Sequence, residues 1–337
     1  MKVLVTGGAG YIGSAVAERL LQSGHRPVVL DNLSMGWRAA VPSAAEFVLA
    51  DSGDAVALRS VFKAARFDAV IHFAALIEAG ESVKHPESYF ENNSLHTLTL
   101  LKTMLEHDVK RFVFSSTAAV YGEPQLLPIP EDHPLSPTNP YGESKLIVER
   151  MLQWLHRAHG LRYASLRYFN AAGATPGRGE AHRTESHVIP LILRVPLGQR
   201  EAFSIFGTDY STRDGTCIRD FIHVDDLATA HLLALDALEQ HSELICNLGS
   251  GNGFSVREII DIARRVTGHP IPVVECARRP GDPAVLIASS EKIREVLGWR
   301  PLYSSIDSIV ESAWEWHRSH PCGYDTSGKL NSHLAES

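Results

Sequence analysis

The sequence predicts an α/β protein with a doubly wound parallel sheet and a smaller α/β domain toward its C-terminal side. Three observations favour this fold. Short apolar runs alternate with amphipathic segments through the first half of the chain, as in parallel sheets that are covered by helices on both faces. A glycine-rich turn joins the first of these runs to the first amphipathic segment. After residue 171 the sequence becomes rich in glycine and in polar and charged residues.

The individual elements follow from these patterns. Strands are expected at 2–6, 27–31, 45–51, 69–75, 111–116 and 162–170. Helices are expected at 11–23, where apolar residues recur at helical spacing, and at 91–107, 142–158 and 223–238. The last helix and the short strand after it resemble parts of the first domain. We therefore expect a first domain of 1–170 plus 222–249, a second of 171–221 plus 250–320, and a flexible tail at 321–337.

Composition restricts the class of protein. The chain has 337 residues, of which 44% are hydrophobic and 21% charged, as in ordinary globular proteins. Its formal net charge of −7 (32 − 39) gives no general attraction to nucleic acid or anionic lipid. No apolar run approaches the roughly 18 residues that a membrane span needs. The four cysteines are far apart and form no CxxC motif, so we expect no disulfides, no zinc or other metal site, and a cytoplasmic location.

The turn TGGAGYIGS indicates a dinucleotide site. Gly7, Gly10 and Gly13 follow the first strand and open the first helix. Glycines there allow the backbone to approach a pyrophosphate, and the helix N-terminus offers free N–H groups to it. Asp31 ends the second strand, where a carboxylate accepts hydrogen bonds from ribose hydroxyls and repels a 2′-phosphate. The sequence therefore favours NAD over NADP.

The segment NPYGESK indicates a catalytic pair. Tyr141 and Lys145 lie four residues apart at the start of a helix, so they share one helix face. A tyrosine is a poor base at neutral pH, because its pKa is near 10. A lysine ammonium on the same face, together with a positive nicotinamide ring, is expected to lower that pKa. Ser115, Ser116 and Thr117 end a parallel strand, where a hydroxyl can share a proton with the phenol.

Several segments together resemble the extended short-chain dehydrogenase/reductase family, and within it the nucleotide-sugar 4-epimerases. They include TGGAGYIGS, DNLS, SSTAAVYGE, PYGESK, IFGTDYSTRDGTCIRDFIHVDDLA and RRPGDPA, and they extend over nearly the whole chain. The resemblance implies a Rossmann-type domain with NAD and a nucleotide-sugar-binding C-terminal domain. It also implies reversible inversion at carbon 4 of a UDP-hexose, UDP-glucose or UDP-galactose, through a 4-keto intermediate.

The resemblance also assigns residues. It implies that Tyr141, Lys145 and Thr117 act on the sugar. The implied NAD contacts are Gly7, Gly10, Tyr11, Ile12, Gly13, Asp31, Asn32, Ser34, Gly36, Asp51, Ser52, Phe73, Ala74, Ala75, Asn92, Ser115, Tyr141, Lys145 and Phe169. The implied UDP-sugar contacts are Thr117, Asn170, His187, Val188, Phe203, Phe206, Arg219, Arg279, Asp282 and Leu286. Leu286 stands where some members carry a bulky tyrosine, so UDP-N-acetylhexosamines are expected to be accepted as well.

Alternatives remain at this point. A dehydratase needs an acid–base pair after Thr117, where this chain has Ala118 and Ala119, so dehydration is disfavoured. A 4-epimerase of UDP-pentose or UDP-uronate would use the same machinery. A non-catalytic NAD-sensing regulator is less favoured, because the Tyr–Lys pair is retained. The resemblance further implies a homodimer in which the helices at 91–107 and 142–158 pair with those of a second copy.

Overall fold

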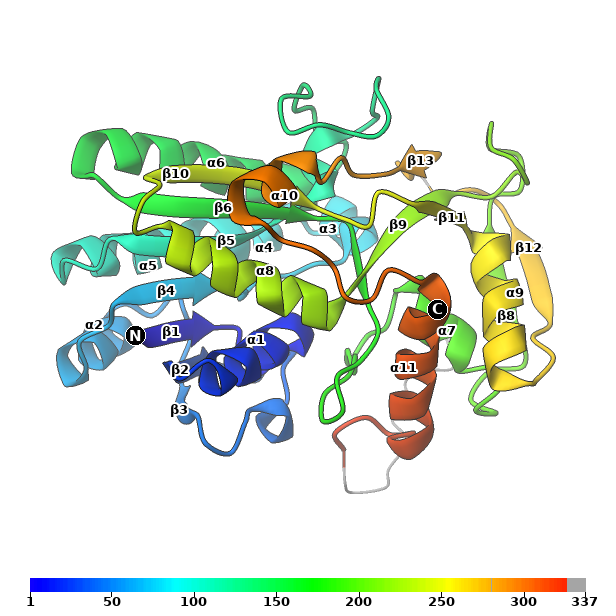
Figure 1. Ribbon diagram of the computed structural model, residues 1–337, viewed down its shortest axis with the longest axis horizontal. Coiled ribbons are helices and arrows are strands. Elements are labelled where there is room, and N and C mark those ends of the chain that lie inside the picture. The colour runs from blue at the N-terminus through cyan, green and yellow to red at the C-terminus, as the bar shows by residue number, and fades with distance from the viewer. Residues whose placement is uncertain (280, 326–337) are drawn as a thin grey trace.

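A seven-stranded parallel sheet forms the larger part of the protein (Figure 1). The computed structural model describes residues 1–279 and 281–325. The strand order is β10 (Glu243–Leu248), β6 (Arg162–Tyr168), β5 (Arg111–Thr117), β4 (Ala69–His72), β1 (Lys2–Thr6), β2 (Arg26–Asp31) and β3 (Glu46–Leu49). The chain builds outward from β1 to β3 and then crosses to β4, so the order reverses between β1 and β4. The predicted doubly wound, Rossmann-type sheet is confirmed, and such a reversal opens a ligand crevice at the carboxyl edge of the strands.

Helices cover both faces of this sheet, each over its own apolar core. On one face α1 (Tyr11–Gln22) and α8 (Val224–Ala237) pack together, and buried side chains such as Leu20 and Leu235 join the core beneath them. The other face is covered by α2 (Ala55–Ala64), α5 (His96–Glu106) and α6 (Pro140–His159). Shorter helices connect these elements: η1 (Arg38–Ala40), α3 (Ala79–Lys84), α4 (Pro86–Tyr89), η2 (Phe90–Leu95) and η3 (Ala118–Tyr121).

Local sequence fixes both ends of α6, which carries the predicted catalytic pair. Asn139 caps the helix by accepting a hydrogen bond from the backbone N–H of Gly142 at 2.9 Å. Pro140 occupies the first helical position, where its missing N–H costs nothing. Gly160 ends the helix at φ +67°, a left-handed conformation that favours glycine. These signals place the start of α6, and with it Tyr141, at the carboxyl edge of the sheet.

A second lobe lies beside that edge (Figure 1). One small sheet contains β11 (Gly253–Ser255), β9 (Ile218–His223), β13 (Val285–Leu286) and β7 (Asn170–Ala172), and another pairs β12 (Val273–Cys276) with β8 (Phe203–Phe206). The helices α7 (Val188–Leu193), α9 (Val256–Thr267) and α11 (Ile306–Ser319) pack around a separate core. The helix α10 (Glu291–Leu297) packs instead against β10 and α8 of the large sheet.

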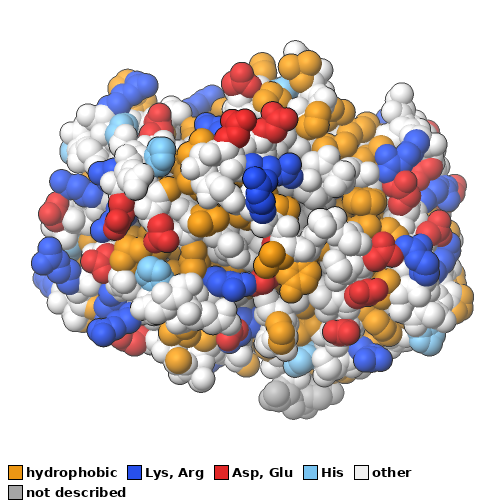
Figure 2. Space-filling model, in the orientation of Figure 1, with side chains coloured by type: hydrophobic (Ala, Val, Ile, Leu, Met, Phe, Trp, Pro, Cys, Tyr) orange, Lys and Arg blue, Asp and Glu red, His pale blue; other side chains and the backbone are white. Residues whose placement is uncertain are grey.

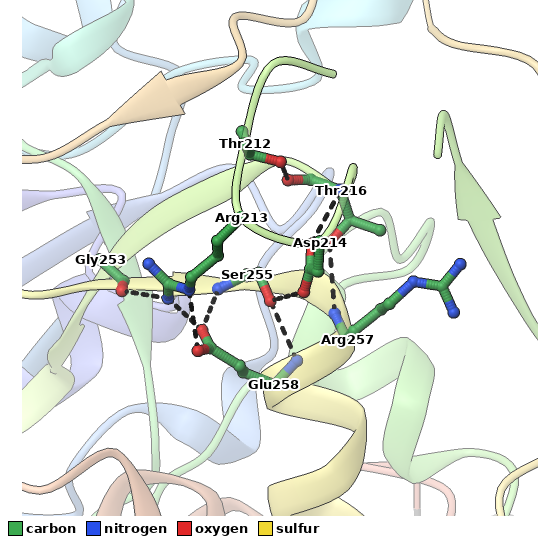
Figure 3. A network of polar contacts seen from close by, with 8 residues as sticks. All are labelled: Thr212, Arg213, Asp214, Thr216, Gly253, Ser255, Arg257 and Glu258. Carbon is green, nitrogen blue, oxygen red and sulfur yellow. Dashed lines mark hydrogen bonds and ion pairs between the residues drawn. The ribbon is translucent and has the colours of Figure 1, made fainter. Parts of the chain in front are cut away.

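A polar network fixes the loop before β9 to the start of α9 (Figure 3). Ser255 and Glu258 form a capping box at the helix N-terminus. Arg213 forms an ion pair with Glu258, and Ser255 donates a hydrogen bond to Asp214. Asp214 also accepts the backbone N–H of Thr216 at 2.9 Å. The network therefore anchors the loop that leads into β9, the strand that carries Arg219.

The elements differ from the sequence prediction in a few places. The run 162–170 divides into β6 and β7, and the first turn of the predicted helix at 91–107 is the π-helix η2. Ile293 and Trp299 join the core of the large sheet. The segment around α10 therefore packs with the large sheet, although it lies within the predicted second domain at 250–320. The domain boundaries themselves stay a prediction. Residues 326–337 of the expected flexible tail lie outside the described residues. Its first part is ordered, because Tyr324 packs on Trp316 at a ring distance of 5.4 Å.

The surface has a mixed charge. Acidic and basic side chains are interspersed over the face shown in Figure 2. Within the described part of the chain, no helix combines the length and apolar character that crossing a bilayer would require.

Candidate active site

A cavity of about 310 Å³ lies at the carboxyl edge of the sheet, where the strand order reverses. Every residue that the resemblance assigns to NAD lines this cavity, from Gly7 through Phe169. The fold therefore brings together all the residues that the sequence assigns to NAD. Sequence reasoning missed further lining residues, among them Glu78, Tyr168, Gly179, Ala181 and Tyr324. Tyr168 ends β6, and the others come from connecting segments or from the segment after α11.

The glycine turn fits a dinucleotide sterically. Gly7 adopts φ +70°, and a Cβ there would lie 2.4 Å from the backbone nitrogen of Ala74. A Cβ on Gly13 would lie 2.4 Å from the Gly7 carbonyl oxygen, so only glycine allows the turn to close on the helix. A Cβ on Gly10 would meet only the Gly7 carbonyl oxygen, at 3.2 Å. The open side of Gly10 leaves room for a pyrophosphate at the N-terminus of α1.

Asp31 is held in place for a ribose. One carboxylate oxygen accepts the backbone N–H of Ala9 at 3.0 Å, and the other accepts that of Leu33 at 2.8 Å. Beside it, Asn32 donates to Asp51 at 2.7 Å. Burial raises the pKa of Asp31, while the two backbone N–H groups oppose that rise. The fixed carboxylate retains lone pairs for ribose hydroxyls and disfavours a 2′-phosphate, as the NAD prediction requires.

The predicted catalytic residues meet on the cavity wall. Tyr141, Lys145 and Thr117 all line the cavity, and the Thr117 side chain is close enough to the phenol to lower the pKa of Tyr141. The Lys145 ammonium donates to the backbone carbonyl of Ser115 at 2.8 Å. Ser116 points away from the cavity and donates to Glu149 at 2.6 Å. At the end of β5, Thr117 therefore lies in the cavity with the phenol, whereas Ser116 has a structural role through its bond to Glu149.

Burial dominates the electrostatics of the pair in the chain without cofactor. It raises the pKa of Tyr141, and the Thr117 side chain offsets this only in part. Burial lowers the pKa of Lys145 to about 7. The joint lowering of the phenol pKa by Lys145 and a positive nicotinamide ring stays a prediction.

The predicted UDP-sugar residues fall into two groups. Thr117, Asn170 and His187 line the cavity. The others lie outside it in the second lobe, where Arg219 faces Asp282 at 3.8 Å and the Arg279 guanidinium stacks 4.1 Å from the ring centre of Phe206. Leu286 packs against the same small apolar cluster as Phe169, Val188 lies against the core of this lobe, and the Phe203 side chain is buried within that core. Any contact from Phe203 to a base would therefore come from its backbone.

The fold and this cavity define an NAD-dependent enzyme of the Rossmann class, with a tyrosine, a lysine and a threonine at the reacting end. A model of the NAD dependent epimerase/dehydratase family matches residues 3–249, and the chain belongs to that family.

Individual relatives agree along nearly the whole chain. It is 56% identical to a UDP-glucose 4-epimerase of Halalkalibacterium halodurans over 98% of its length and 99% of the relative. A crystal structure of a UDP-glucose 4-epimerase superposes with a TM-score of 0.93 at 50% identity, covering 96% of this chain and all (100%) of the other. The enzyme from Bifidobacterium longum, solved in complex with NAD⁺ and UDP, gives a TM-score of 0.93 at 38% identity, with 96% and 100% covered.

Proposed function

We propose that this protein interconverts UDP-glucose and UDP-galactose by inverting carbon 4 of the sugar with bound NAD. The observation that carries the proposal is the Tyr141–Thr117 pair, which lies with Lys145 on the wall of the dinucleotide cavity. The relatives that match nearly the full chain carry the same activity in their names.

Bound NAD supplies a hydride acceptor and donor for carbon 4. Tyr141 takes the proton from the 4-hydroxyl as the hydride leaves, and it returns a proton when the 4-keto sugar is reduced on its other face. Thr117, beside the phenol, favours its deprotonated form. Lowering the phenol pKa by about three units requires roughly 4 kcal/mol of preferential stabilisation of the phenolate. Lys145 contributes to this through its positive charge when protonated.

The nucleotide has to provide most of the binding energy, because the sugar must turn over between the two reductions. Arg219 and Arg279 are suited to the diphosphate, since guanidinium groups match phosphate oxygens in geometry and charge. Asp282, which faces Arg219 at 3.8 Å, is suited to the uridine ribose. Asn170 and His187 line the same cavity as Tyr141. The substrate therefore extends from the second lobe into the cavity.

The test of this function is conversion of UDP-galactose by the purified protein, with and without added NAD. We expect UDP-glucose to accumulate to an equilibrium mixture. A protein that leaves UDP-galactose unchanged in the presence of NAD would contradict the proposal. UDP-pentose and UDP-uronate substrates, assayed in parallel, test the alternative specificity. Activity with any of them would exclude the NAD-sensing regulator.

Leu286 is expected to allow UDP-N-acetylglucosamine as a further substrate. It is partly buried and packs on the same apolar cluster as Phe169, which lines the cavity. Leu286→Tyr should lower kcat/KM for the acetamido sugar by about tenfold or more, because inserting bulk against a bound group costs about 1–3 kcal/mol. Turnover of UDP-glucose should change little. Equal losses on both substrates would show that Leu286 does not face the 2-substituent.

We also propose a homodimer formed through α5 and α6. Leu98, Ile147, Arg150, Met151, Trp154 and Leu155 line an open groove of about 290 Å³ on these helices. Trp154 is 67% exposed, which is unusual for so large an apolar side chain.

Four free cysteines support a reducing, cytoplasmic setting for the protein.

Trp154→Glu is expected to convert the dimer to a monomer, because it places a charge in the centre of the proposed contact. Leu302→Glu serves as the control, since Leu302 is 76% exposed and lies away from both helices. Sedimentation velocity measures both variants and the wild type. A wild-type protein that sediments as a monomer would refute the dimer.

A further inference from the structure

Four metal-binding side chains converge beside the cavity. Glu180, His182, Glu185 and His187 each offer one ligand atom, and these atoms all lie within 4.8 Å of one another. All four residues come from the loop between β7 and α7. Neither the NAD chemistry nor the hydride transfer uses Glu180, His182 or Glu185.

The distances between these atoms suit one small cation. His187 Nδ1 lies 2.9 Å from Glu180 Oε1 and 2.8 Å from Glu185 Oε1, and His182 Nδ1 lies 3.2 Å from Glu180 Oε1 and 3.6 Å from Glu185 Oε2. Tetrahedral zinc with ligand bonds of about 2.0–2.2 Å holds its ligand atoms about 3.3–3.6 Å apart. These four distances lie near that spacing, and a bound ion would draw the remaining atoms of the cluster, all within 4.8 Å of one another, closer together.

Hydrogen bonds and ion pairs join His187 to both carboxylates, but one nitrogen of the cluster has no hydrogen bond. His182 Nδ1 is buried and has no hydrogen-bond partner, although carboxylate oxygens lie within 3.6 Å of it. The side chains of Glu180 and Glu185 are only 5% and 2% exposed, and carboxylates buried this deeply are normally paired or bound to a metal. With both imidazoles neutral the cluster carries a charge of −2, which one divalent cation balances.

We propose that Glu180, His182, Glu185 and His187 form a structural site for one divalent transition-metal ion, with zinc as its occupant. Imidazole and carboxylate ligands suit zinc, and four protein ligands leave no open coordination position for catalysis. The absence of cysteine motifs predicted no metal site, and the four residues here include no cysteine. The inference does not depend on the sugar specificity proposed above.

The ion would fix the part of the loop that forms the cavity wall. Gly179 and Ala181 line the cavity, and Trp37 donates from its indole to the Ala181 carbonyl at 2.6 Å. The Tyr11 ring meets His182 edge-on at 6.3 Å. A bound ion would join these separate contacts into one rigid wall. Without it, two protonated histidines would have to balance the carboxylates.

The first test is the metal content of protein that carries no affinity tag and is purified without chelator. Elemental analysis should find about one zinc per chain. His182→Gln should reduce zinc to background, while His269→Gln, which alters an exposed histidine elsewhere, should retain it. Wild-type protein that neither contains zinc nor takes it up, or a His182→Gln variant with a full equivalent, would overturn the proposal.

The second test is independent of whether the variant folds. Protein stripped with a chelator should unfold at a lower temperature, and zinc should raise the midpoint by several degrees where magnesium does not. X-ray absorption at the zinc edge should show nitrogen and oxygen ligands at about 2.0 Å, including imidazole scattering. No thermal shift, or a zinc environment containing sulfur, would contradict the assignment.

Discussion

Tyr141→Phe is expected to lower kcat by about 10²- to 10⁴-fold, the usual contribution of a positioned general base. The change removes only the hydroxyl that meets Thr117 on the cavity wall. The KM for the UDP-sugar should change little, because the nucleotide supplies the binding energy. Initial rates of UDP-galactose conversion, measured at saturating substrate, check this expectation.

A matched control separates loss of the base from loss of the fold. Tyr303→Phe removes a hydroxyl elsewhere and keeps the aromatic ring, which stacks on His223 at 3.7 Å. It should retain the wild-type kcat, and both variants should retain the wild-type NAD content and thermal midpoint. If Tyr141→Phe kept full activity, proton transfer would have to involve another group, and the proposed mechanism would be wrong.

Much of the fold and cofactor site can be predicted from the sequence because their signals are local. Apolar runs mark the strands, and in a parallel sheet the residues that end those strands meet at one edge. Gly7, Asp31 and Ser115 lie far apart in the chain, yet each ends or follows a strand of the large sheet. The rule that ligands bind at this edge therefore places them together.

Other features depend on packing between distant segments. Tyr324 reaches the cavity wall only because the chain end folds back against Trp316. The raised pKa of Tyr141 follows from its burial, which the spacing of PYGESK does not indicate. The leucines of the two helices expected at the dimer contact also differ in exposure: Leu101 and Leu152 are fully buried, whereas Leu98 lines the open groove. Helical spacing alone cannot tell a core face from a docking face.

The largest effect on stability is expected from Glu149→Ala, because it would leave a buried arginine without its partner. Arg167 donates to the Glu149 carboxylate at 3.0 and 2.6 Å, and both side chains are only 2% exposed. Ser116, next to Thr117, donates to the same carboxylate at 2.6 Å. Removing one partner of such a pair costs about 3–5 kcal/mol. Urea unfolding at fixed protein and NAD concentrations should show this loss as a lower midpoint.

The double variant Glu149→Leu/Arg167→Met should be more stable than Glu149→Ala, since an apolar pair removes both buried charges together. Glu106→Ala is the exposed control. It breaks an ion pair with Arg59 of similar length, 3.0 Å, but both partners are solvated, so the midpoint should hardly move. Equal effects of Glu149→Ala and Glu106→Ala would show that the buried pair is not needed for stability. If instead the double variant regains stability but not kcat, the pair has a second role: Glu149 holds α6 against β6 and, through Ser116, against β5, and thereby positions Tyr141 against Thr117.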